Sequence, residues 1–159
     1  MSLYAIRRNY CDHVLIVRPA SEAEVRPVQL RVLRPDGPLP GDTPFPAHWG
    51  HVAALVDDQV IGACSIGPSP WPRPDLAELP APQWQLRSMA VLPEHRGGVG
   101  AVLLSAAEDI AAREQVASLW ATARVRALGL YRRGGWRVVG PEWDKPGVGP
   151  HRYVIRLMR

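Results

Sequence analysis

The chain has 159 residues, of which 47% are hydrophobic, and its formal net charge at pH 7 is +4. This length suits a single domain with a buried core, and no apolar run approaches the roughly 20 residues that a membrane-spanning helix needs. The positive charge is almost entirely arginine, scattered without any block of like charges, so a nucleic-acid-binding domain ranks last among the function classes considered.

The N-terminal residues Met1–Arg8 include basic side chains but no apolar segment long enough for a signal peptide. We therefore expect a cytoplasmic protein that does not bind membranes. Cys11 and Cys64 are the only cysteines and lack C-x-x-C spacing, so each is expected to be a free thiol. The histidines show no paired ligand spacing either, and no metal site is predicted.

The first elements are predicted between the N-terminus and Pro35. Leu15–Arg18 is a short apolar run typical of a strand, and Ser21–Glu24 has the spacing of a helix capping box. Apolar residues continue at helical spacing, but Pro27 conflicts with an unbroken helix. We expect the helix to restart with Pro27 in its first turn and to end before Pro35.

Two proline-rich loops alternate with strands in the middle of the chain. Pro35–Pro46 is predicted to be a loop, and it is followed by a hairpin made of His51–Val56 and Val60–Ile66. The second loop, Pro68–Pro82, leads into a strand at Trp84–Val91.

The clearest helix begins after Gly98, where one continuous apolar face is formed by Val99, Val102, Leu103, Ala106, Ala107 and Ile110. A short strand is expected at Leu119–Ala121, then a short helix that ends at Gly134–Gly135 and a strand at Trp136–Val139. The last strand alternates, with Tyr153, Ile155 and Leu157 opposite Arg152 and Arg156. This order predicts a mixed α/β fold with adjacent antiparallel strands.

One glycine-rich turn carries the main chemical signal. In Met89–Ala101 a strand ends, Pro93 redirects the chain, and glycines open an amphipathic helix. Glycines allow a ligand to approach the backbone, and the N–H groups at a helix N-terminus favour anions. Arg96 adds a charge-assisted donor. The turn therefore suits a phosphate or pyrophosphate, although such a turn can also serve packing alone. It matches neither the dinucleotide fingerprint nor a P-loop.

The turn resembles motif A of the GNAT N-acetyltransferase superfamily. The family has an apolar triplet, a proline two residues later, and R/Q-x-x-G-x-G/A at the start of a helix. Here the triplet is Met89–Val91, the proline is Pro93, and the loop is His95–Gly100. His95 occupies the usual Arg or Gln position, and the loop is one residue shorter than is common.

A second segment strengthens the resemblance. Ala127–Trp136 is similar to the family's A-x-x-F-Y-x-x-x-G-F pattern, with Leu130 in place of the first aromatic residue and Trp136 in place of the last. The two segments lie about 30 residues apart in the family's order, and the resemblance covers Gln83–Arg159. The ending Gly147–His151 resembles that of a subset of small bacterial members whose substrates are often unassigned.

The resemblance implies a GNAT acyl-CoA N-acyltransferase fold, with a mainly antiparallel central sheet flanked by helices in one domain, residues 1–159. It implies acetyl-CoA as co-substrate, with pantetheine on the backbone of the strand end and pyrophosphate on the loop. The residues implied to bind the cofactor are Met89, Ala90, Val91, Arg96, Gly97, Gly98, Val99, Gly100 and Ala101.

Tyr131 is implied to protonate the departing CoA thiolate. A tyrosine with a pKa of about 10 can donate to a thiolate whose pKa is about 8.5. The alternative is a core tyrosine that packs a helix against the sheet. The base that deprotonates the amine could be His151, Glu142, Glu94 or His95, each of which could instead be a surface or structural residue.

The predicted function is direct transfer of acetyl from acetyl-CoA to a primary amine in a ternary complex. The rival interpretation is an acyl-CoA-binding module without turnover. The amine that accepts the acetyl group belongs to one of four classes that the sequence leaves open: small amines, amino acids, antibiotics and protein amines. Its pocket could include Arg31, Arg34, Asp36, Asp42, His48 and Trp49. A homodimer is compatible with these observations.

Overall fold

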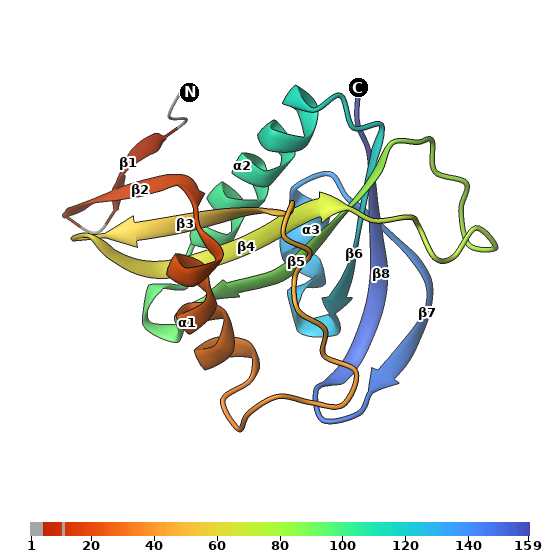
Figure 1. Cartoon of the computed structure of the whole chain (residues 1–159), viewed down its shortest axis with the longest axis horizontal. Helices are drawn as coiled ribbons and strands as arrows, with labels where there is room; N and C mark the ends of the chain where they lie inside the picture. Colours follow the sequence, from red (N-terminus) through yellow and green to blue (C-terminus); the bar gives the residue numbers. More distant parts are fainter. Residues whose placement is uncertain (1–4, 11) are drawn as a thin grey trace. The chain divides into compact units, whose positions relative to one another are not determined.

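The computed structural model describes residues 5–10 and 12–159 (Figure 1). The predicted thiol of Cys11 and the predictions for Met1–Tyr4 lie outside the described residues. The strands are β1 (Ile6–Tyr10), β2 (His13–Ala20), β3 (Gly50–Val56), β4 (Gln59–Pro68), β5 (Gln83–Val91), β6 (Ser118–Arg124), β7 (Arg137–Lys145) and β8 (Gly149–Leu157). The helices are α1 (Glu22–Leu33), α2 (Val99–Arg113) and α3 (Leu128–Arg133), with short 3-10 turns η1 (Pro93–His95) and η2 (Val125–Ala127).

The fold is mixed α/β with mainly antiparallel strand pairing, as the sequence predicted. The chain forms two compact units. The first unit contains Met1–Ile66 and Ser88–Glu108, and the second contains Gly67–Arg87 and Asp109–Arg159. β5 and α2 each contribute to both units. A single N-acetyltransferase domain over residues 1–159 stays a prediction.

In the first unit, β1 to β4 pair antiparallel in sequence order. Val25 of α1 packs against Ala53 and Ala63, which places α1 on one face of β3 and β4. Cys64, the next residue of β4, approaches the backbone of Leu103 in α2. Because successive residues of a strand point to opposite faces, α2 covers the other face. The predicted hairpin of β3 and β4 is confirmed.

Helix α1 begins at the predicted capping box. The Ser21 hydroxyl accepts from the Glu24 backbone N–H, and the Glu24 carboxylate accepts from the Ser21 N–H. The predicted restart at Pro27 is wrong, because Pro27 lies inside one continuous helix. Pro27 has no backbone N–H to donate to the Ala23 carbonyl. Both residues are exposed. Water can therefore replace the lost helical hydrogen bond.

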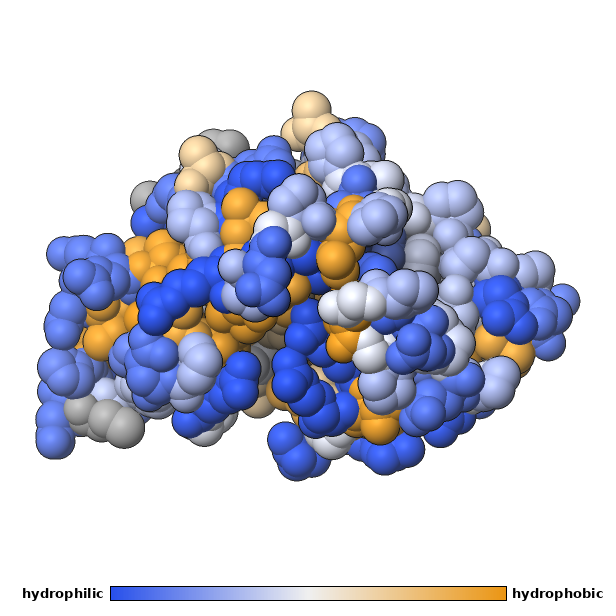
Figure 2. Space-filling view, turned by 90° about the horizontal axis from the view of Figure 1, so that it is seen from below, coloured by the Kyte–Doolittle hydropathy of each residue, from blue (hydrophilic) through white to orange (hydrophobic). Residues whose placement is uncertain are grey.

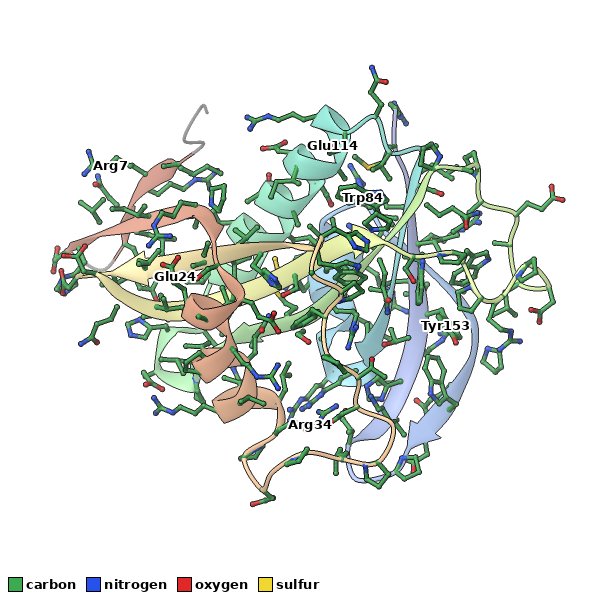
Figure 3. The ribbon with its side chains drawn as sticks, viewed as in Figure 1. Arg7, Glu24, Arg34, Trp84, Glu114 and Tyr153 are labelled. Carbon is green, nitrogen blue, oxygen red and sulfur yellow. The ribbon has the colours of Figure 1, made fainter. Side chains whose placement is uncertain are left out.

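In the second unit, the first three residues of β5 pair parallel with β6, which pairs antiparallel with β8, and β8 pairs with β7. Arg156 of β8 donates to the carbonyl of Gly134 at the end of α3. Tyr153, which is labelled in Figure 3, therefore lies on the face of β8 that points away from α3. Its ring contacts Trp71 and Trp143.

Two strands differ from the prediction. The charged sequence of Ile6–Tyr10 gave no strand signal, yet it forms β1 on the edge of the sheet. The strand predicted at Trp136–Val139 begins one residue later and extends to Lys145, with a register shift after Val139 and a positive φ at Gly140. No helix among the described residues is long and apolar enough to span a bilayer.

Candidate active site

The end of β5 carries a local break in the strand conformation. Ser88 has a φ of 55°, which is unusual for a residue with a side chain. The parallel pairing of β5 with β6 extends to Gln85, three residues before Ser88. Met89 and Val91 are half-buried, whereas the Ala90 side chain is 2% exposed. The predicted pantetheine-binding residues thus follow directly after the break.

Gly62 of β4 lets this strand end lie close to its neighbours. A Cβ at Gly62 would be 3.2 Å from the Ala90 carbonyl oxygen and 3.1 Å from the Leu103 side chain. The Leu92 N–H donates to the Ile61 carbonyl at 2.8 Å. Close backbone approach therefore holds the end of β5 beside β4, at the part of β4 that also lies next to Leu103 of α2.

The predicted phosphate-binding turn is open. Gly97 and Gly98 have φ values of 132° and 103°, and a Cβ on either would meet no atom within 4 Å. Arg96, immediately before them, is exposed. A β-branched side chain would be strained at these φ values, while the space around both residues is free for a ligand.

The turn leads into the N-terminus of α2. Val102 donates to the Gly98 carbonyl at 3.3 Å, so the N–H groups of Val99, Gly100 and Ala101 precede the first helical hydrogen bond. The first turn of α2 contains no acidic residue. The helix dipole therefore favours an anion here, and the chemistry of these residues fits a pyrophosphate.

A buried polar cluster beside β5 was missed by the sequence prediction. Gln29 of α1, His51 of β3 and Ser65 of β4 are 4%, 7% and 0% exposed. The Gln29 Nε2 donates to the Ser65 Oγ at 2.9 Å and to the Ser88 carbonyl at 3.3 Å. The His51 Nδ1 lies 2.7 Å from the same Ser65 Oγ. The available signal was the presence of polar residues within otherwise apolar runs.

Burial changes the acidity of two side chains in the first unit. Desolvation lowers the pKa of His51, and the negative charge of Glu22 partly opposes it. Burial raises the pKa of the Cys64 thiol to about 12. At neutral pH, His51 is therefore largely neutral and Cys64 is a thiol with little nucleophilic character.

In the second unit, Tyr131 lies on α3 and is 4% exposed. Its ring packs edge-on against Trp136, and the Trp136 N–H donates to the Tyr131 carbonyl. Core packing and proton donation, the two roles predicted for Tyr131, both need a ring that is held in place, as this ring is.

His151, also in the second unit, has a defined tautomer. Its Nδ1 lies 2.8 Å from the Gly149 carbonyl oxygen, which can only accept, so Nδ1 carries a proton. The lone pair of the neutral ring is then on Nε2. The ring contacts Trp143, the register partner of His151 on β7. Glu142, next to Trp143, is exposed.

The other two base candidates lie in the first unit. Glu94 is exposed and 3.5 Å from Arg31. The His95 carbonyl accepts from the Tyr10 hydroxyl at 3.0 Å. Among residues 5–10 and 12–159, no group of three or more His, Cys, Asp or Glu side chains is arranged to hold a metal ion.

Exposed large hydrophobic side chains are dispersed over the described part of the chain. They are Val14 on β2, Leu30 on α1 and Leu157 on β8. Figure 2 shows hydrophilic and hydrophobic side chains intermixed on one face.

Comparison with known proteins identifies relatives of this chain. The model of the Acetyltransferase (GNAT) family matches residues 22–136. The N-acetyltransferase YitI of Bacillus subtilis, itself uncharacterized, is 33% identical over 110 residues, which cover 69% of this chain and 71% of YitI.

Solved structures share the fold at lower identity. A protein described as an N-acetyltransferase from Lactobacillus plantarum has a TM-score of 0.72 at 17% identity, covering 91% of this chain and 99% of its own. The ribosomal-protein-alanine N-acetyltransferase of Brucella melitensis has a TM-score of 0.65 at 20% identity, with coverage of 89% and 99%. The Salmonella typhimurium protein yncA, which is described as an acetyltransferase and was solved with acetyl-CoA, has a TM-score of 0.65 at 16% identity, with coverage of 91% and 94%.

Proposed function

The chain belongs to the GNAT acetyltransferase family, and from this premise we propose that it transfers the acetyl group of acetyl-CoA directly to a primary amine. The observation that carries the proposal is the open turn at Gly97 and Gly98, which precedes a helix N-terminus without acidic residues. This turn would hold the pyrophosphate of CoA, with Arg96 as an additional cation.

The backbone of Met89–Val91 would pair with the pantetheine arm as an added strand does. One of its N–H groups would donate to the thioester carbonyl oxygen as negative charge develops there. A fixed backbone donor of this kind is worth several kcal/mol of barrier reduction in enzymes that use it. The break at Ser88 supports this role because it changes the strand conformation just before these residues.

In the reaction, the neutral amine nitrogen attacks the thioester carbon, the C–S bond breaks, and the sulfur receives a proton that Tyr131 would supply. The nitrogen, which is positively charged after the attack, releases one proton as it becomes the amide nitrogen, and this proton would restore the Tyr131 hydroxyl. The packing of Tyr131 against Trp136 supports the role, because a donor that is held in place loses little entropy in the transition state.

The attacking amine must first lose a proton. His151 is the preferred acceptor, because its Nδ1–H is bound to the Gly149 carbonyl and the Nε2 lone pair of the neutral ring is basic. Glu142 is the alternative. It is exposed, so a bound substrate would have to cover it and exclude water. Transfer of the acetyl group through Cys64 is disfavoured, because a thiol pKa of about 12 leaves almost no thiolate to attack the thioester.

The function is tested in two steps. First, acetyl-CoA and CoA should raise the melting temperature more than NAD or ATP does, because a ligand that binds only the native state stabilises it. Second, CoA release should be measured with a panel of amines that includes a peptide with N-terminal alanine, the acceptor type in the name of the Brucella structure. No shift with millimolar acetyl-CoA would refute the proposal, and binding without turnover on any amine would favour an acyl-CoA-binding module.

A further inference from the structure

Gln29 is a polar residue on the buried face of α1. The other buried residues of this helix are Val25 and Val28, and Gln29 itself is only 4% exposed. Its Nε2 uses both protons, one toward the Ser65 Oγ and one toward the Ser88 carbonyl. Gln29 therefore links three elements of the first unit: α1, β4 and β5.

The orientation of this carboxamide follows from chemistry. The Ser88 carbonyl can only accept, so the nitrogen of Gln29 and not its oxygen must face it. The Ser65 hydroxyl, which accepts from Gln29, has its own proton available for the His51 Nδ1 at 2.7 Å. The cluster of Gln29, Ser65 and His51 is thus a directed chain that holds the carboxamide against Ser88.

The two ends of this carboxamide differ. The Gln29 Oε1 is buried and has no hydrogen-bond partner among the described residues. The Nε2, in contrast, satisfies the Ser65 hydroxyl and the Ser88 carbonyl, which an apolar side chain at this position would leave without these donors. The polar function of Gln29 therefore lies at its nitrogen.

The contact with Ser88 lies where the conformation of β5 changes. Ser88 has a φ of 55°, a conformation that a serine keeps only when its surroundings enforce it. The Gln29 Nε2 donates a hydrogen bond to the Ser88 carbonyl. The conformation at Ser88 sets the direction of the backbone groups of the next three residues, Met89–Val91.

We propose that Gln29 is a positioning residue, which holds Ser88 in its left-handed conformation and thereby aims the backbone of Met89–Val91 at the acyl-CoA. This rests on the proposed function, which gives that backbone its ligand. Ser65 and His51 act through Gln29 by fixing its carboxamide.

The test uses Gln29→Leu, the double variant Gln29→Leu/Ser88→Gly, and Leu30→Ala as a control at an exposed position of the same helix. Gln29→Leu should weaken CoA binding and lower kcat/KM about fivefold to tenfold, the effect of one lost hydrogen bond. The ligand-free protein should show faster amide hydrogen exchange at Met89–Val91. Glycine accepts a positive φ without strain, so Ser88→Gly should restore most of both properties in the double variant. Leu30→Ala should behave as the wild type.

A folded Gln29→Leu with wild-type CoA affinity and wild-type exchange at Met89–Val91 would overturn the proposal. So would equal losses in the single and double variants, because Gln29 would then act elsewhere than at Ser88. If Gln29→Leu does not fold, Ser65→Ala takes its place and should cause a smaller loss in the same direction, with a wild-type result counting against the proposal. Absence of CoA binding by the wild type would refute the proposed function itself.

Discussion

The phenol ring of Tyr131 lies edge-on to the indole of Trp136, with 5.3 Å between the ring centroids and 69° between their planes. Because the ring makes this contact, Tyr131→Phe keeps the packing and removes only the hydroxyl. We expect kcat to fall by roughly 100-fold, within the range for loss of a positioned proton donor. The melting temperature and the affinity for acetyl-CoA should change little.

Tyr153→Phe is the matched control for Tyr131→Phe, since Tyr153 also packs against indole rings in the second unit. It should retain wild-type turnover. A Tyr131→Phe protein that is folded and fully active would remove Tyr131 from the mechanism, whereas one that unfolds would favour the core role.

Replacing Gly98 by valine should weaken CoA binding at least tenfold. The glycine has a φ of 103°, and a β-branched side chain would strain the turn and fill the space beside it. Gly41→Val is the control, because Gly41 has a φ of 88° and equally open surroundings in a different loop. Isothermal titration with CoA should separate the two. Equal affinities in both folded variants would show that the glycine turn serves only the fold.

Cys64 should be inert in the folded protein. With a thiol pKa of about 12 and no exposed surface, it should react with iodoacetamide at pH 8 about a thousandfold more slowly than an ordinary cysteine. Cys64→Ala should keep turnover while losing about 1 kcal/mol of stability. Peptide mass spectrometry measures the labelling. Loss of turnover without unfolding would instead indicate an acetyl-cysteine intermediate.

Stability should decrease as the pH falls below about 6.5, the usual pKa of histidine, because burial lowers the pKa of His51 in the folded state. In that range the unfolded chain binds a proton that the folded chain does not, so acid favours unfolding. Melting temperatures between pH 7.5 and 5.5 should show a smaller decrease for His51→Asn than for the wild type. His48→Asn, at an exposed position, should follow the wild type. Parallel curves for all three proteins would contradict this assignment.

Much of the fold could be predicted because local patterns and packing agree. Three local sequence patterns each indicate a single type of structure. They are the capping box at Ser21, the apolar runs that form the hairpin of β3 and β4, and the apolar face of α2. The positive φ values of Gly97 and Gly98 match the expectation that glycines open the turn. Pro27 was misjudged because the pattern does not show that the affected helical carbonyl faces water.

The polar cluster could not be predicted from the pattern. Gln29, Ser65 and His51 are far apart in the sequence, and periodicity does not show which polar residue will be buried opposite another. The left-handed conformation of Ser88 gives no signal, because serine does not usually adopt it. Tertiary contacts determine both features.

The first part of the first proline-rich loop is enclosed by a contact between Arg34 and Asp42. Arg34, which is labelled in Figure 3, lies at the C-terminal end of α1. It donates through Nε and Nη2 to the two carboxylate oxygens of Asp42 at 2.7 Å each. The Leu39 N–H donates to the same carboxylate. The Arg34–Asp42 pair thus joins the end of α1 to a residue inside the loop. Sequence changes confined to residues 35–38 would vary the enclosed segment while the residues that enclose it stay joined.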